Sequence, residues 1–329
     1  MIRAVARRDF LKTASAAAAW TYAASRGADA AVQQSSNPGA EPPIARPAYP
    51  PEAGPVVAID EAHRNTHSIG GAFKGLGRLL TRDGFRVRPL ADAISREALE
   101  GIGVLVIAQP GGWDGADASL DDGEAATLLE WVRRGGSLLL ILDHRPGPAG
   151  GQRMTSALGI ESWHDGYAAV DTPDGPVYTI RYQRSGRQPE AEVFPTLGGG
   201  TAWQGPDALV LDHLITAGRG AAERVDSVMT FGGSAFRPPP GAEPLLVLPA
   251  RAISLAPTAP DGNPRVPGTP RVPVGGWLGG AVLRVDRGRV ALFAETGMFS
   301  AQWPVHEAAS QNYKLVVNVM RWLSGALAK

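Results

Sequence analysis

Side chains that can bind ligands or move protons follow four apolar segments of this chain. One cluster runs from Asp60 to His67, and the others begin at Gln109, Asp143 and Glu295. Carboxylates beside neutral imidazoles can divide the roles of general acid and general base when their surroundings separate their pKa values. The candidate catalytic residues are Asp60, Glu61, His63, Asp143, His144 and Glu295, and the candidate ligand-binding residues are Asn65, His67, Gln109, Trp113 and Gln302.

Some of these candidate residues could instead bind a divalent metal. Asp60, His63 and His67 carry oxygen and nitrogen donors suited to Zn, Mn or Fe. The two histidines have i, i+4 spacing, but they fall in a predicted loop, so a shared helix face is not assured. The sequence requires no cofactor, and a divalent metal stays an open alternative.

Each candidate also has a structural explanation. Asp60 could accept hydrogen bonds from backbone N–H groups, Asp143-His144 could be a turn at a strand end, and Glu295 could belong to a salt bridge. The isolated residues His164, His213 and His306 are better explained by local structure than by chemistry.

The apolar segments that precede the clusters alternate with helical patterns. The expected strands are 56–59, 85–88, 104–108, 137–142, 245–248, 280–285 and 289–294, and the expected helices are 73–80, 95–100, 121–134 and 312–324. Central strands that are apolar throughout indicate a parallel sheet covered on both faces. The expected fold is α/β, with a mostly parallel sheet, helices on both faces and β-hairpin insertions in residues 145–205. Ligands bind at the carboxyl edge of such sheets, so the four clusters are predicted to share one pocket.

The amino-acid composition argues against two classes of function, nucleic-acid binding and cysteine-dependent chemistry. The 329 residues carry 32 basic and 32 acidic side chains, which argues against nucleic acid as a partner. There is no cysteine, which excludes disulfides, thiolate metal sites and cysteine nucleophiles.

The N-terminus resembles a twin-arginine export signal. Arg7-Arg8-Asp9-Phe10-Leu11-Lys12 precedes an alanine-rich run that is too short to span a membrane, and Ala28-Asp29-Ala30 has the form of a cleavage site. We therefore expect a signal peptide at 1–30, a Pro-rich disordered linker at 31–55, and a folded domain at 56–329. The resemblance implies a periplasmic or secreted protein without a stable membrane span in the mature chain.

Three further stretches resemble the ThuA-like proteins of the class I glutamine-amidotransferase-like superfamily. They are the helix-Gly-Gly-strand step at 130–139, the turn His213-Leu214-Ile215-Thr216-Ala217-Gly218, and Gly288-Arg289-Val290 combined with Asn318 and Trp322-Leu323. The resemblance implies a flavodoxin-like sheet. The cysteine that a glutaminase needs is absent, and the elbow-like position after 137–142 is Asp143-His144, so no catalytic residue can be transferred from the family.

Two functions compete on these observations. The first is an exported enzyme, a hydrolase or other acid/base catalyst, that acts on a small polar ligand such as a carbohydrate derivative. The second is a non-catalytic module for carbohydrate binding, in which Trp113, Trp163, Tyr167, Tyr178, Tyr182 and Trp203 would stack on sugar rings, or for assembly through the Pro/Gly-rich loop 256–276.

Overall fold

The structure is a computed structural model that describes residues 41–65, 67–111, 120–183, 192–195, 201–204, 209–210, 212–258, 262–300 and 311–327. The predicted signal peptide and the candidate residues Trp113 and Gln302 lie outside the described residues. Within these ranges, no helix combines the length and the apolar character needed to cross a membrane.

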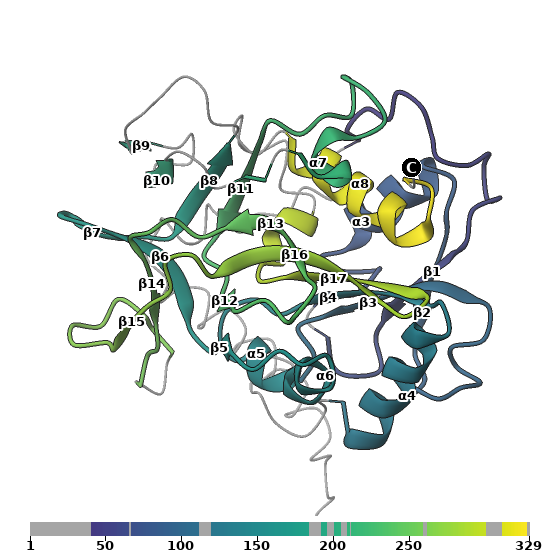
Figure 1. The fold of residues 1–329 in the computed structure, drawn as a ribbon, viewed down its shortest axis with the longest axis horizontal. Helices are drawn as coiled ribbons and strands as arrows, with labels where there is room; N and C mark the ends of the chain where they lie inside the picture. The colour runs from purple at the N-terminus through teal and green to yellow at the C-terminus, as the bar shows by residue number, and fades with distance from the viewer. Residues whose placement is uncertain are drawn as a thin grey trace, which may run out of the picture.

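A nine-stranded sheet forms the centre of the fold (Figure 1). Five strands run parallel in the order β2-β1-β3-β4-β17, which is the flavodoxin-like order. They are β1 (Val56–Asp60), β2 (Arg86–Leu90), β3 (Ile102–Ala108), β4 (Ser137–Ile141) and β17 (Gly288–Phe293). The α/β class and the parallel sheet predicted from the apolar strands are confirmed.

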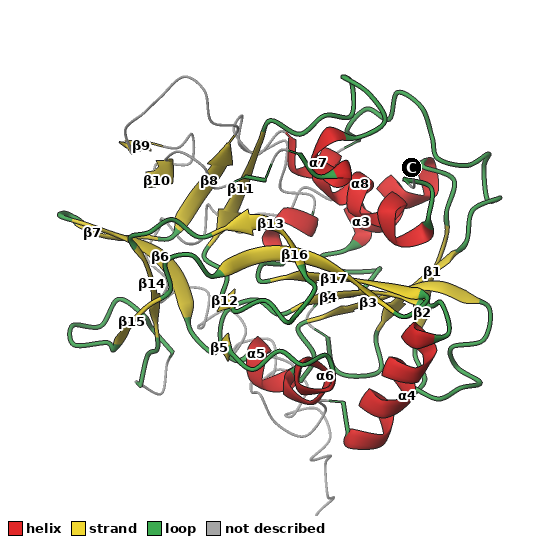
Figure 2. Cartoon of the chain, in the orientation of Figure 1, coloured by secondary structure: helices red, strands yellow, loops and turns green. Residues whose placement is uncertain are grey.

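Helices cover both faces of this sheet (Figure 2). On one face, α3 (Lys74–Arg82) and α8 (Asn312–Ser324) contribute to one large apolar core; on the other, α4 (Asp122–Arg133) and α6 (Gln152–Ala157) contribute to a second. The short helices are α5 (Gly147–Gly150), α7 (Leu214–Ala217) and the 3-10 turn η1 (Gly297–Phe299). The sheet therefore lies between two layers of helices.

Antiparallel strands extend the sheet beyond β17. The hairpin partner β16 (Leu278–Val285) pairs with β17, with β12 (Ala235–Phe236) and with β13 (Glu243–Val247), and β5 (Trp163–His164) pairs with β12. Two four-stranded sheets stand beside this end of the molecule (Figure 1). One contains β6 (Tyr167–Thr172), β7 (Gly175–Val177), β14 (Ala252–Leu255) and β15 (Arg271–Pro273); the other contains β8 (Thr179–Gln183), β9 (Glu192–Pro195), β10 (Thr201–Gln204) and β11 (Ser227–Phe231).

Local sequence signals explain the start of α4 and the end of α8, but they wrongly predict a helix at 95–100. Asp121 and Glu124 form a capping box at the start of α4, as the aspartates before that helix predicted. Gly325, in the left-handed region at φ 82°, ends α8. The helix predicted at 95–100 is wrong: Ser95 accepts from Ala98 N through its side chain, but the segment forms only turns before β3.

The described part of the predicted linker packs on the domain. We call residues 41–55 the N-terminal strap. Tyr49 packs edge-on against Phe85 with ring centroids 5.3 Å apart, and its hydroxyl lies 3.0 Å from Ser324 Oγ. Gly54 N donates to Gly84 O in the turn between α3 and β2, so the strap is held there before it continues into β1. The prediction of a free linker up to Pro55 is wrong for the strap, because backbone groups and one aromatic ring offset its poverty in apolar side chains.

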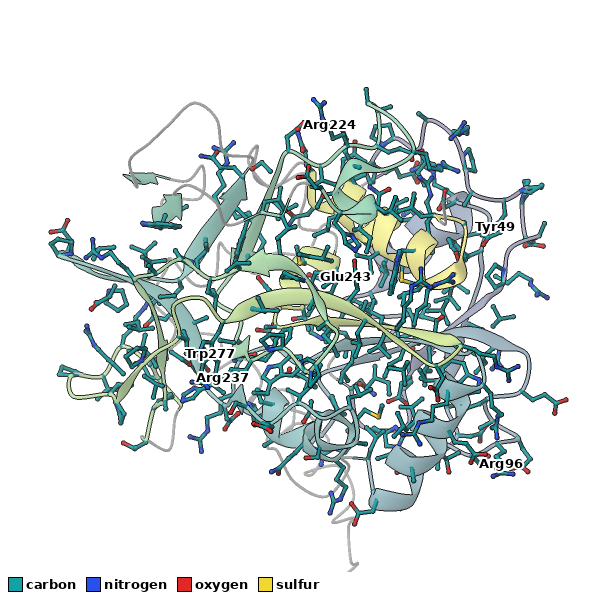
Figure 3. The ribbon with its side chains drawn as sticks, in the orientation of Figure 1. Tyr49, Arg96, Arg224, Arg237, Glu243 and Trp277 are labelled. Atoms are coloured by element: carbon teal, nitrogen blue, oxygen red, sulfur yellow. The ribbon has the colours of Figure 1, made fainter. Side chains whose placement is uncertain are left out.

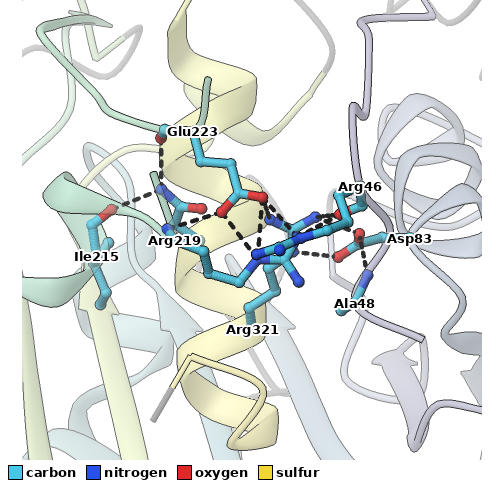
Figure 4. A network of polar contacts seen from close by, with 8 residues as sticks. Arg46, Ala48, Asp83, Ile215, Arg219, Glu223 and Arg321 are labelled. Carbon is cyan, nitrogen blue, oxygen red and sulfur yellow. Dashed lines mark hydrogen bonds and ion pairs between the residues drawn. The ribbon is translucent and has the colours of Figure 1, made fainter. Parts of the chain in front are cut away.

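A buried ion network attaches the strap to the rest of the domain (Figure 4). Arg321 on α8 donates to both carboxylate oxygens of Asp83, at 2.8 Å and 2.6 Å, and pairs with Glu223 at 3.0 Å. The same guanidinium donates to the Arg46 carbonyl, and Asp83 accepts from Ala48 N. The strap is thus attached through its own backbone to charged groups from α3 and α8.

Candidate functional site

Asp143 and Glu295 occupy equivalent positions at the ends of two adjacent parallel strands. The last paired residues of β4 and β17 are Ile141 and Phe293, and each carboxyl residue lies two positions further along its strand. Neighbouring strands are about 4.8 Å apart, so the two carboxyl groups leave the sheet side by side. Both are buried, with 6% and 4% of their surface exposed.

The Asp143 carboxylate is tied to the segment that follows Glu295. Its Oδ2 atom accepts from Thr296 N at 3.0 Å and from the Thr296 hydroxyl, and its Oδ1 atom accepts from His144 N at 2.6 Å. Both oxygens of the Asp143 side chain are thus held by hydrogen bonds from neighbouring residues. Thr296 was not among the predicted residues, although its place directly after Glu295 was a usable signal.

Glu295 lies in an environment that favours the protonated acid. Burial, followed by the negative charge of Asp143, raises the pKa of Glu295 to about 8, against the opposing effect of hydrogen bonds from Phe231 N and Gly297 N. At neutral pH Glu295 is therefore mostly protonated, which is the form that a general acid needs.

Two histidines flank the pair. Burial lowers the pKa of His67 to about 4, with Asp143 and His144 as its electrostatic neighbours, so its imidazole is neutral at pH 7. His144 stacks on Tyr167 with ring centroids 4.3 Å apart, and its Nδ1 atom lies 2.9 Å from the Arg145 carbonyl. Tyr167 belongs to the adjacent antiparallel sheet, so the β-insertion supplies one wall of the site. We refer to Asp143, Glu295, His67 and His144 as the carboxyl-pair site.

Asp60 and His63 form a different cluster. His63 Nδ1 lies 2.9 Å from Asp60 Oδ2, and His63 Nε2 lies 2.8 Å from Oε1 of Glu124 on α4. Asn65 donates to the same Asp60 oxygen and accepts from Ala108 N at the end of β3. Burial opposes the charged imidazole, but the two carboxylates outweigh it and raise the pKa of His63 to about 9. His63 thus links β1 to α4, and Asn65 links β1 to β3, which is a structural arrangement.

The remaining candidate residues make hydrogen bonds within the protein. Glu61 is exposed and accepts from Ile69 N at 2.8 Å, which fixes the loop before α3. Gln109 is fully buried, and its side-chain amide bonds to the backbone of Asp143 and His144. Glu124 was missed, although its place in the capping box of α4 was visible in the sequence. The strand-end pattern grouped Glu61 and Gln109 with the carboxyl-pair site, whereas their contacts serve the surrounding structure.

The residues proposed as metal ligands do not present a free donor set. Both ring nitrogens of His63 are occupied by carboxylates, and Asp60 already accepts from His63, Asn65 and Ala62 N. Within the described part of the chain, no group of three or more His, Asp or Glu side chains is placed to hold a metal ion. Asp60 and His63 therefore do not fit a metal site, because their donor atoms are already engaged within the protein.

Four of the described aromatic side chains proposed to stack on sugar rings pack against other parts of the protein. Tyr182 and Trp203 are buried in the core, Trp163 stacks on Phe236, and Tyr167 lies against His144. Trp277, which was not predicted, has the Arg237 guanidinium 4.9 Å from its ring centroid, and the two are seen together near β5 and β12 (Figure 3).

The motifs that carried the family resemblance are structural here. His213 caps α7 by accepting from Ile215 N, and Asn318 on α8 donates to Ile215 O and Glu223 O. A Cβ atom on Gly288 would lie 2.0 Å from Val132 O, so only glycine allows β17 to start against the end of α4. These positions specify packing of the fold and contribute nothing to the carboxyl-pair site.

Comparisons with known proteins support the fold. No protein-family model matches the chain, and a search of curated proteins finds no match. The chain is similar to the solved N-terminal domain of mmIFT52, with a TM-score of 0.53 and 15% identity over 82% of this chain and 96% of that chain. Similar solved structures also include ThuA-like proteins from Bacteroides uniformis ATCC 8492 (TM-score 0.39, 11% identity, 86% of this chain and 94% of that chain) and Parabacteroides merdae ATCC 43184 (0.40, 12%, 82% and 90%). At these identities the likeness concerns the fold, and the ThuA-like family stays a prediction from the sequence motifs.

Proposed function

We propose that this chain binds a small polar ligand at the carboxyl-pair site and acts on it by general acid–base chemistry. The observation that carries the proposal is the buried pair Asp143 and Glu295 at equivalent ends of β4 and β17. Glu295, with a pKa of about 8, would donate a proton at neutral pH, while the carboxylate of Asp143 would accept one. His67, neutral at pH 7, is a hydrogen-bonding partner for the ligand.

The ligand class that we test first is a carbohydrate derivative. Carboxyl pairs suit hydroxyl-rich ligands because a carboxylate accepts, and a carboxylic acid donates, a hydrogen bond to a hydroxyl group. We also propose that the protein is exported by the twin-arginine route, from the arginine pair and the Ala28-Asp29-Ala30 triplet. Without cysteine, these 329 residues have no nucleophile for a glutaminase thioester.

Calorimetric titration of the full chain with neutral and acidic monosaccharides and their lactones tests binding. We expect Asp143→Asn and Glu295→Ala to weaken binding at least about tenfold, since each removes a hydrogen-bonding group of the pair. Glu97→Gln, at an exposed glutamate, is the matched control. Equal affinities in all four proteins would exclude the carboxyl-pair site as the binding site.

Turnover separates the enzyme from the binding module. Release of nitrophenol from nitrophenyl glycosides, lost in Asp143→Asn and retained in Glu97→Gln, would support catalysis. Binding without turnover of any tested substrate would favour the non-catalytic module. Metal analysis of protein purified without chelator tests the metal alternative in the same samples.

A further inference from the structure

Gln109 has an unusual backbone conformation at the end of β3. Its φ angle is 56°, in the left-handed region that residues other than glycine seldom adopt, and its side chain has no exposed surface. Its backbone N–H donates to Ile141 O, which extends the ladder between β3 and β4 by one residue. The chain is therefore held in this conformation directly beside the residues that precede Asp143.

The side-chain amide of Gln109 bridges to the turn after β4. Oε1 accepts from Asp143 N at 2.8 Å, and Nε2 donates to His144 O at 3.0 Å. The Gln109 amide thus binds both the N–H group of Asp143 and the carbonyl group of His144. Thr296 holds the Asp143 side chain, so backbone and carboxylate are fixed from two different elements.

The space around this amide is also specified. A Cβ atom on Gly147 would lie 1.9 Å from Gln109 Oε1, so the start of α5 passes against the amide at a distance that only glycine permits. A carboxylate at position 109 would place an acceptor against the His144 carbonyl, and an apolar side chain would leave both backbone groups without partners. The geometry therefore requires a glutamine amide of this length.

We propose that Gln109 is a positioning residue that fixes the Asp143-His144 turn and thereby sets the placement of the Asp143 carboxylate against Glu295 and of the His144 ring against Tyr167. This inference rests on the proposed function of the carboxyl-pair site, but its test needs no ligand. The sequence pattern assigned Gln109 to ligand binding, whereas both polar ends of its side chain are used within the protein.

The test is a carboxyl-carbon NMR titration of Glu295 in the full chain. Gln109→Asn is the decisive variant, because asparagine tolerates the left-handed region but is one methylene too short to reach both backbone groups. We expect the variant to fold and the pKa of Glu295 to fall by about 1 or more, because a mobile turn lets water in and moves the Asp143 charge away. Gln152→Asn, at an exposed glutamine, should leave that pKa unchanged.

A second variant perturbs the Gln109 amide through its neighbour Gly147 on α5. Gly147→Ala keeps Gln109 but displaces its side chain, so it should shift the pKa of Glu295 in the same direction. A folded Gln109→Asn protein with the wild-type pKa of Glu295 would overturn the positioning role. Loss of the folded state in Gln109→Asn would also overturn it, because Gln109 would then be needed for stability of the whole domain. Failure of ligand binding with a shifted pKa would count against the proposed function alone.

Discussion

Asp83 and Arg321 are 238 residues apart in the chain and form a buried ion pair through two hydrogen bonds. Asp83 follows α3 and Arg321 lies on α8, and neither side chain exposes more than 2% of its surface. The pair joins the two helices that cover one face of the sheet, and it also holds the strap through Ala48 N and Arg46 O. A buried charge without its partner is costly, so each member depends on the other.

Removal of one partner should destabilise the protein strongly. We expect Arg321→Met to lower the free energy of unfolding by about 3 to 5 kcal/mol, because Asp83 would remain buried without its counter-charge. Arg96→Met is the control, since Arg96 pairs with Glu130 on the surface near α4 (Figure 3) and exposed pairs contribute less than about 1 kcal/mol. Urea unfolding of both variants measures the difference. Similar decreases in the free energy of unfolding would mean that the buried pair contributes no more than the exposed pair.

The strap should contribute to stability through Tyr49. A double-mutant cycle with Tyr49→Phe and Ser324→Ala should give a coupling energy of about 1 kcal/mol, the usual value for one hydrogen bond. Deletion of residues 41–55 should lower the melting temperature, since it also removes the Tyr49 ring from Phe85. A coupling energy near zero together with an unchanged melting temperature would show that the strap does not pack on the domain in solution.

Glu295 should make stability depend on pH in a defined direction. Its pKa is about 8 in the folded protein against 4.5 as the ordinary value, so the folded state holds a proton that the unfolded state releases. The resulting stabilisation is complete below pH 4.5 and is lost as the pH rises from 4.5 through 8. Glu295→Gln cannot titrate, so its stability relative to wild type should rise by a few kcal/mol across that window, at about 1.4 kcal/mol per pKa unit.

Urea titrations at several pH values between 5 and 9 provide the measurement for Glu295. Glu97→Gln should show no such trend, because Glu97 is exposed. If the difference between Glu295→Gln and wild type were flat with pH, Glu295 would be ionised in the folded protein and the acid role would fail.

His63 should stay charged at neutral pH. With a pKa of about 9 against an ordinary 6.5, its stabilising contribution is complete below pH 6.5 and disappears as the pH rises through 9. His63→Gln should therefore be less stable than wild type at pH 6, by roughly 1 to 3 kcal/mol, and the deficit should shrink above pH 9. Imidazole proton NMR gives a direct check: His63 titrates near pH 9, whereas His67 stays neutral down to about pH 4.

Much of the fold could be predicted because its signals are local. The apolar strands and the helix at 312–324 depend on hydrophobic periodicity, and the hairpin of β16 and β17 depends on the turn before Gly288. Asp143 and Glu295 could be paired in advance because parallel strands place their carboxyl ends at one edge. The rest depended on distant partners. No local pattern reveals that Glu124 faces His63 or that Asp83 and Arg321 hold the strap.

The contact between Tyr49 and Ser324 places the two ends of the domain side by side, although 275 residues separate them in the chain. A short peptide could therefore join the region after α8 to the strap, and new termini could be opened in a surface turn such as that around Gly268. The domain is thus suited to circular permutation. For the same reason it could be inserted whole into a surface loop of another protein without forcing the host's two attachment points apart.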